Sequence, residues 1–119
     1  MLGAIIGDIV GSPFEVHNLR SKEFELFGAF NRFTDDTVLT LATAQALLNG
    51  TSFEDSYRKN GWLYPTVGYG PLFRTWLGSK TPKPYGSIGN GAAMRVSPVG
   101  HFSKSLEEAH LLAERSAAP

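Results

Sequence analysis

The 119-residue sequence contains no cysteine and no excess of charge of either sign. The absence of cysteine excludes disulfides, zinc–thiolate sites and a cysteine nucleophile, and it is typical of cytoplasmic proteins, so we expect a cytoplasmic location. Eleven basic residues balance eleven acidic residues. No net field therefore favours nucleic acid or an anionic membrane surface, and we expect neither as a partner.

Long apolar runs and strand patterns are also scarce. No stretch approaches the roughly 20 apolar residues of a membrane span. The apolar start, Met1–Gly11, has no basic residues before it, and Asp8 interrupts it, so it is a poor match to a signal sequence. The length fits one domain. We therefore predict one soluble all-α domain over residues 1–119.

The first predicted helix covers residues 2–12 and is expected to be buried. Gly3, Gly7 and Gly11 recur every four residues along it. Each glycine costs about 1 kcal/mol relative to alanine inside a helix, so a packing reason is expected. The spacing predicts a face where another backbone approaches closely. Pro13 leaves open whether Glu15 continues along this helix or lies just beyond its end.

The strongest helical pattern covers residues 35–48, which are apolar nearly all round, as in a central helix. Asn49 and Gly50 supply its end. Capping patterns and proline positions predict further helices over 52–63, 71–76, 92–96 and 105–116. Residues 16–33 and 78–91 are predicted as loops.

Aromatic residues are numerous in the first of these loops. Phe24, Phe27, Phe30 and Phe33 are spaced by three, and we interpret them as anchors in the core. The same interpretation, or a place in a cleft wall, is given to three further aromatic residues: Trp62, Tyr69 and Trp76.

Two hydroxyls flank two carboxylates in Thr34-Asp35-Asp36-Thr37, directly before the central helix. These residues are suited to cap the helix, because their oxygens accept from free N–H groups and their charge complements the helix dipole. They are equally suited to bind a hard cation, since Mg²⁺ and Mn²⁺ prefer carboxylate and hydroxyl oxygens. On this stretch alone capping is the commoner outcome.

A glycine-rich loop, Tyr85–Gly91, precedes a predicted helical turn. Such a loop can direct backbone N–H groups at a phosphate, although an ordinary turn has the same composition. It matches neither a Walker A motif nor a dinucleotide fingerprint. Arg95, just behind it, is expected either to meet phosphate or to pair with a carboxylate inside the fold.

Three separated stretches together resemble the ADP-ribosylglycohydrolase family. They are Gly3–Glu15, with the pattern Gly-x₃-Gly-Asp-x₂-Gly-x₃-Glu, then Phe33–Thr37, and then Tyr85–Arg95. The resemblance covers essentially the whole chain. It implies an orthogonal multi-helix fold with a binuclear Mg²⁺ centre, Mn²⁺ in some members, in a cleft that binds ADP-ribose or an ADP-ribosylated protein.

The resemblance also assigns roles by residue. It implies metal ligation by Thr34, Asp35 and Asp36, and it places Asp35 and Asp36 with Glu15 in the catalytic group. Asp8 is interpreted as a structural residue or a support for the ligands. The implied contacts to the diphosphate and ribose come from the second glycine motif: Gly86, Ser87, Gly89, Asn90 and Gly91. The implied reaction is hydrolysis of the glycosidic bond at the ribose anomeric carbon, with Glu15 as base or charge stabiliser.

A second acidic motif of the family, of Asp-x-Asp-Thr type, has no counterpart here, since no aspartate follows Asp55. We therefore expect the N-terminal portion of a longer domain. The alternatives are completion by a second chain or by self-association, or a short member that binds without turnover. A half-domain exposes surfaces that its missing helices would cover, which favours self-association.

Overall fold

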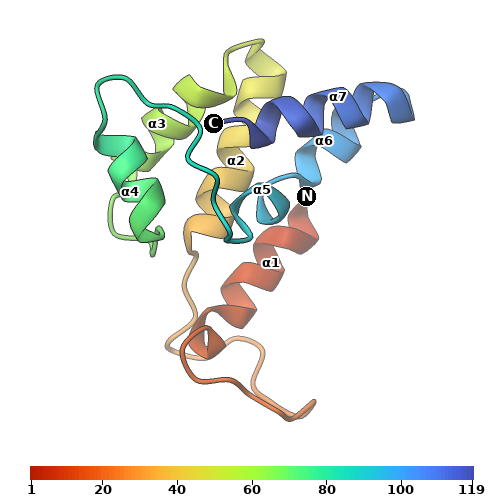
Figure 1. Ribbon diagram of the computed structural model, residues 1–119. Coiled ribbons are helices and arrows are strands. Elements are labelled where there is room, and N and C mark those ends of the chain that lie inside the picture. The colour runs from red at the N-terminus through yellow and green to blue at the C-terminus, as the bar shows by residue number, and fades with distance from the viewer.

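The computed structural model describes residues 1–119 and is entirely helical, which confirms the all-α prediction (Figure 1). No helix is long and apolar enough to cross a membrane. Helix α6 was not expected from the sequence. In chain order the elements are α1 (Leu2–Gly11), the 3₁₀ turn η1 (Ser12–Phe14), α2 (Asp35–Asn49), α3 (Phe53–Leu63), α4 (Pro71–Gly78), α5 (Gly91–Met94), α6 (Ser97–Phe102) and α7 (Leu106–Ala117).

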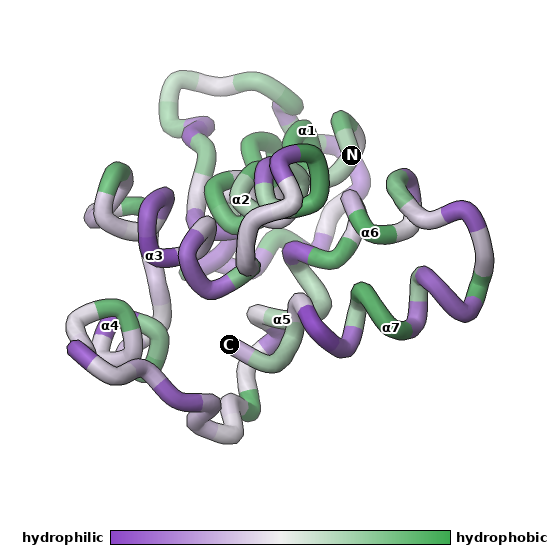
Figure 2. The backbone as a smooth tube through the Cα atoms, turned by 90° about the horizontal axis from the view of Figure 1, so that it is seen from above, coloured by the Kyte–Doolittle hydropathy of each residue, from purple (hydrophilic) through white to green (hydrophobic).

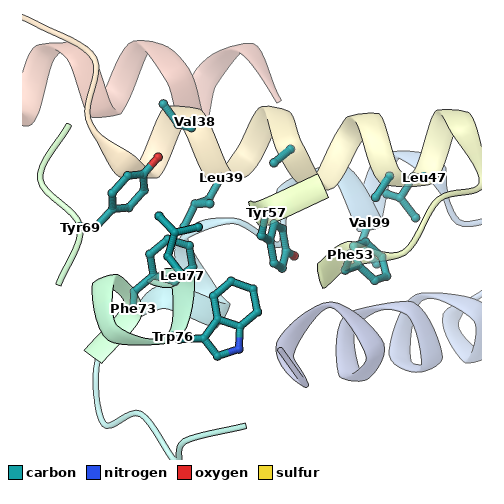
Figure 3. Packing of buried hydrophobic residues seen from close by; sticks show 12 residues of the cluster. Val38, Leu39, Leu47, Phe53, Tyr57, Tyr69, Phe73, Trp76, Leu77 and Val99 are labelled. Atoms are coloured by element: carbon teal, nitrogen blue, oxygen red, sulfur yellow. The ribbon is translucent and has the colours of Figure 1, made fainter. Parts of the chain in front are cut away.

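Helix α2 is the centre of the fold, as its apolar composition predicted. It packs against α1, α3, α5 and α6. The core along it is drawn from α2, α3, α4 and α6 and from the segment before α4 (Figure 3). Gly50 ends α2 in the left-handed conformation, with φ of 64°, which a glycine adopts without a steric penalty. The twelve core residues are Val38, Leu39, Ala42, Ala46, Leu47, Phe53, Tyr57, Tyr69, Phe73, Trp76, Leu77 and Val99.

Both predicted capping motifs are present. The Ser52 hydroxyl accepts from Asp55 N at 3.0 Å at the start of α3, and the Ser105 hydroxyl accepts from Glu108 N at 3.1 Å at the start of α7. Each cap contributes about 1 kcal/mol. In Figure 2, α7 alternates between hydrophilic and hydrophobic segments, as expected for an amphipathic helix whose inner face packs against α5 and α6.

The prediction of a buried, closely packed first helix is wrong. Helix α1 has no buried residue. A Cβ added to Gly3, Gly7 or Gly11 would meet no atom within 4 Å. Helix α1 lies against α2, and the loop that follows it extends away from the rest of the fold (Figure 1). The glycine face of α1 is therefore open.

The aromatic anchors predicted in the loop are also wrong. Phe24, Phe27, Phe30 and Phe33 are all exposed, Phe30 at 83%. Two of them have aromatic partners outside the core: the ring of Phe24 meets Phe14 edge to face at 5.4 Å, and that of Phe33 meets Tyr64, at the end of α3, at 5.7 Å. Of the other aromatic residues, Tyr69 and Trp76 are buried as expected, whereas Trp62 is exposed.

Arg95 does not pair with a carboxylate inside the fold, one of the two partners proposed for it, and donates to backbone carbonyl oxygens instead. It is buried, and it donates to the carbonyl oxygen of Ser116 at 2.9 Å near the end of α7. Its guanidinium carbon lies 4.1 Å from the centre of the Tyr57 ring, a cation–π distance. The Tyr57 hydroxyl donates to the same Ser116 carbonyl at 3.1 Å. Arg95 thus joins α5, α3 and α7 beneath the glycine-rich loop.

Candidate functional site

Asp8 connects α1 to the first turn of α2. One of its oxygens accepts from Thr34 N at 2.8 Å and from Thr37 N at 3.2 Å, and it also accepts from the Thr37 hydroxyl at 2.5 Å. The other oxygen accepts from the Thr34 hydroxyl at 2.5 Å. The carboxylate is therefore the main acceptor at the positive end of α2, where its charge is favourable. This agrees with the structural role predicted for Asp8.

The loop before α2 is fixed to the end of α1 by side chains. Asn31 donates to the carbonyl oxygens of Ile9 at 2.8 Å and Val10 at 3.3 Å. Arg32 N donates to the Ser12 hydroxyl at 3.0 Å. These bonds satisfy carbonyls that a helix end leaves free. They also hold the two helix ends together, so that Asp8 reaches Thr34.

Asp35 and Asp36 follow in the first turn of α2, and both are partly buried. The pKa of Asp35 is raised from its ordinary 3.8 to about 6, mainly by burial and in addition by the charges of Asp36, Glu15 and Asp8. Burial is also the largest cause of the raised pKa of Asp36, followed by the charges of Asp8 and Glu15. The side chains that raise these pKa values are all acidic, so the site carries concentrated negative charge.

Glu15 lies on the same side of the molecule as Asp36. The turn η1 continues the chain past Pro13, and Glu15 follows it with helical backbone angles. Glu15 and Asp36 line one hollow of about 490 Å³, together with Gly7, Asp8, Gly11, Phe14 and Asn90. The open glycine face of α1 thus forms a wall of this hollow, a role that the sequence did not indicate.

A second hollow, of about 300 Å³, lies between the glycine-rich loop and the start of α4. Asp35 lines it from α2, and Arg95 lines it from behind the loop. Asn90 lines both hollows. Asp35 and Asp36 therefore line two neighbouring hollows, which meet at Asn90 in the glycine-rich loop. The sequence did not predict that Asn90 would line both hollows.

The glycine-rich loop is exposed along most of its length. Gly86 has φ of 60°, where a side chain would be strained, and Gly89 N donates to the Ser87 hydroxyl at 3.1 Å. Gly91 begins α5. Ile88 is fully exposed and makes no stacking platform. Ser87, Gly89 and Gly91 line the second hollow with Asn90, whereas Gly86 lies at a further hollow on the side of Arg95.

The side-chain oxygens at the start of α2 are suitable ligands for a hard cation. The Thr34 hydroxyl donates a hydrogen bond to Asp8 and accepts one from Asp36 N at 3.4 Å, which leaves one lone pair of its oxygen able to ligate. Beside Asp35, the buried Tyr69 hydroxyl has no hydrogen-bond partner. No group of three or more acidic, histidine or cysteine side chains is arranged as a complete metal site.

Comparison with known proteins gives concordant matches. A sequence model of the ADP-ribosylglycohydrolase family matches residues 1–119. The chain is 28% identical over 156 residues to ADP-ribosylhydrolase ARH3 of Mus musculus, covering 98% of this chain and 41% of that protein. It is 33% identical over 127 residues to ADP-ribosylhydrolase ARH3 of Xenopus tropicalis, covering 81% and 36%. The chain thus spans about two fifths of the length of these curated relatives.

Proposed function

The chain belongs to the ADP-ribosylglycohydrolase family, and we propose that it forms the nucleotide-binding side of a Mg²⁺-dependent hydrolase of ADP-ribose conjugates. The bond to be cleaved is the glycosidic bond of an ADP-ribosylated protein or of a small ADP-ribose conjugate. The observation that carries the proposal is the pair of hollows that meet at Asn90, one lined by Glu15 and Asp36 and the other by Asp35 and the glycine-rich loop.

Thr34, Asp35 and Asp36 are the residues that would hold the metal, Mg²⁺ or Mn²⁺. Their oxygens suit hard cations. The charged side chains that shift the pKa values of Asp35 and Asp36 are all acidic, so none of them offsets the negative charge of the site. A pair of such ions, when bound, would orient the substrate and polarise water. Asp8 supports this site by fixing Thr34 and the first turn of α2.

Glu15 is the proposed catalytic base or charge stabiliser. Its carboxylate is exposed in the hollow that Asp36 also lines. Hydrolysis at the anomeric carbon passes through an oxocarbenium-like transition state, which a carboxylate stabilises by its charge. The same carboxylate can accept the proton that the attacking water loses.

The proposed substrate contacts come from the loop residues Gly86, Ser87, Gly89, Asn90 and Gly91. Small residues allow the diphosphate to approach the backbone closely, and backbone N–H groups are natural donors to phosphate oxygens. The positive φ of Gly86 permits the turn that presents them. Buried Arg95 holds the end of α5 from behind through its bond to Ser116.

Completion of the site by further acidic ligands is part of the proposal. The described residues supply an incomplete shell, and the relatives are more than twice as long. The remaining ligands would come from a complementing C-terminal portion or from a second chain, docked on the open face of α1. The alternative is an inactive module that binds ADP-ribose, favoured by the same incomplete shell.

Calorimetry and an ADP-ribose release assay test the proposal. With Mg²⁺, the chain is expected to bind ADP-ribose, and Asn90→Ala should weaken binding at least tenfold. Release of ADP-ribose from a modified peptide, lost in Asp35→Ala and retained in the exposed control Glu107→Ala, would support the hydrolase. Binding without release, when the chain is assayed together with a complementing C-terminal portion, would support the inactive module. Absence of both, with the protein folded, would refute the proposal.

A further inference from the structure

The two most deeply buried tyrosines differ in how their hydroxyls are satisfied. Tyr57 and Tyr69 are 0% and 1% exposed. The Tyr57 hydroxyl bonds to the Thr43 hydroxyl and to the Ser116 carbonyl oxygen, each at 3.1 Å. The Tyr69 hydroxyl has no partner at all. Because burying an unpaired hydroxyl costs free energy, its place in the core needs a reason.

The Tyr69 hydroxyl is directed at the first turns of α2. Figure 3 shows the ring between α4 and α2, with its oxygen toward the part of α2 that carries Val38. The backbone on either side fixes this direction. Asp35 N donates to Val67 O at 3.1 Å, and Tyr69 O accepts from the Arg74 guanidinium at 2.7 Å. These bonds fix the backbone that carries the ring, and the ring itself is packed in the buried core.

Asp35 is the acidic group beside this hydroxyl. A Cβ added to Gly68 would lie 3.4 Å from the Asp35 carboxylate, so the segment that carries Tyr69 touches Asp35 directly. Burial and the Asp35 charge raise the pKa of Tyr69 to about 12. The hydroxyl thus keeps its proton and is available as a donor.

We infer that Tyr69 is a positioning residue for Asp35, and that its hydroxyl donates to the Asp35 carboxylate when that carboxylate ligates a divalent cation. A carboxylate that ligates a metal is commonly held by a donor to its remaining lone pairs. Without the cation the hydroxyl stays unpaired, and with it the pair forms. The inference rests on the proposed metal site and adds a residue outside the family motifs named above.

The test compares Tyr69→Phe with the matched control Tyr57→Phe in thermal unfolding of the full chain, without metal and during titration with MgCl₂ or MnCl₂. Without metal, Tyr69→Phe should unfold about 2–5 °C higher, because an unpaired buried hydroxyl is removed. Its apparent metal affinity should fall about 10–100-fold. Tyr57→Phe should unfold at a lower temperature and bind metal like the wild type.

The possible failures are distinguishable. If the wild type shows no metal-dependent shift, the proposed metal site fails and this inference fails with it. If the wild type and Tyr69→Phe respond equally to metal, only the role of Tyr69 is refuted. A lower unfolding temperature for metal-free Tyr69→Phe would show that the hydroxyl already has a partner, such as a buried water, and would also refute the inference.

Discussion

Neutralising Asp35 is expected to stabilise the metal-free protein. Its pKa of about 6 in the fold exceeds the ordinary 3.8, so the folded state binds this proton more tightly than the unfolded state does. The difference corresponds to at most about 3 kcal/mol at pH 7. Since Asp35 keeps part of its surface exposed, solvent screening reduces this to about 1–2 kcal/mol.

The sign of the pH dependence follows from the same shift. Above pH 6 the ionised carboxylate destabilises the fold, and this destabilisation is relieved as the pH falls from about 6 toward 3.8. The free energy of unfolding should therefore rise on acidification across this window. Asp36, whose pKa is also raised, contributes with the same sign. Saturating Mg²⁺ should reverse the trend, because protons then compete with the metal for the carboxylates.

Urea unfolding with EDTA between about pH 4 and pH 7, which covers the window between the two pKa values, measures this effect. At pH 7, Asp35→Asn should raise the urea midpoint by about 1 M with an unchanged slope, and its profile should be flatter than that of the wild type. Glu107→Gln, on the exposed face of α7, should follow the wild-type profile. Parallel profiles for Asp35→Asn and the wild type would refute the assignment of the raised pKa to Asp35.

Four further substitutions test other contacts. Asp8→Ala should cost about 3 kcal/mol in urea unfolding, since it leaves donors at the start of α2 without a charged acceptor; a loss below about 1 kcal/mol would contradict the connecting role of Asp8. Gly50→Ala should cost about 1 kcal/mol by the same measurement, because φ of 64° strains an alanine, and an unchanged midpoint would argue against the left-handed cap. Phe30→Ser should leave the free energy of unfolding within about 0.5 kcal/mol of the wild-type value. Phe73→Ala should lower it by about 3–5 kcal/mol, because Phe73 is buried. Equal losses for the two variants would show that Phe30 belongs to the core.

The helix starts were predictable because capping chemistry is local. Thr34, Ser52 and Ser105 each accept a bond from an amide two or three residues ahead, and no distant residue is needed to form it. Helix α6 was not predicted, because its six residues include Pro98 and Gly100, and it depends on packing against α2 and α7. Short helices of this kind take their stability from tertiary contacts, which sequence periodicity does not report.

Burial was the weaker prediction. Phe33 and Trp76 are both large and aromatic, yet the first is exposed and the second lies in the core. The spacing of the loop aromatics carries no information about whether the loop folds back on α2. In α1, the glycine spacing predicted the close approach of another backbone, which is wrong: the glycine face is open and forms a wall of the candidate site.

The sequence motifs indicated which residues belong to the candidate site, but not how those residues are arranged around it. The motifs identified Glu15, the aspartates and the glycine-rich loop, and the structure brings Glu15 and Asp36 to one hollow that Asn90 shares. Where Pro13 directs Glu15 depends on the turn η1. The sequence predicted a core or cleft-wall position for Tyr69, but it could not show that the buried hydroxyl has no partner, which is evident only in three dimensions.

The position of Asp8 also has an electrostatic consequence for α2. The beginning of a helix carries a partial positive charge of about half an elementary unit, which by itself attracts anions and repels metal ions. Asp8 places a full negative charge against that same helix end, bonded to the amides of Thr34 and Thr37. The local potential therefore changes sign before Asp35 and Asp36 are counted. A helix terminus of the kind that elsewhere binds phosphate is here electrostatically suited to a cation, and in the proposed function the phosphates would bind at the glycine-rich loop instead.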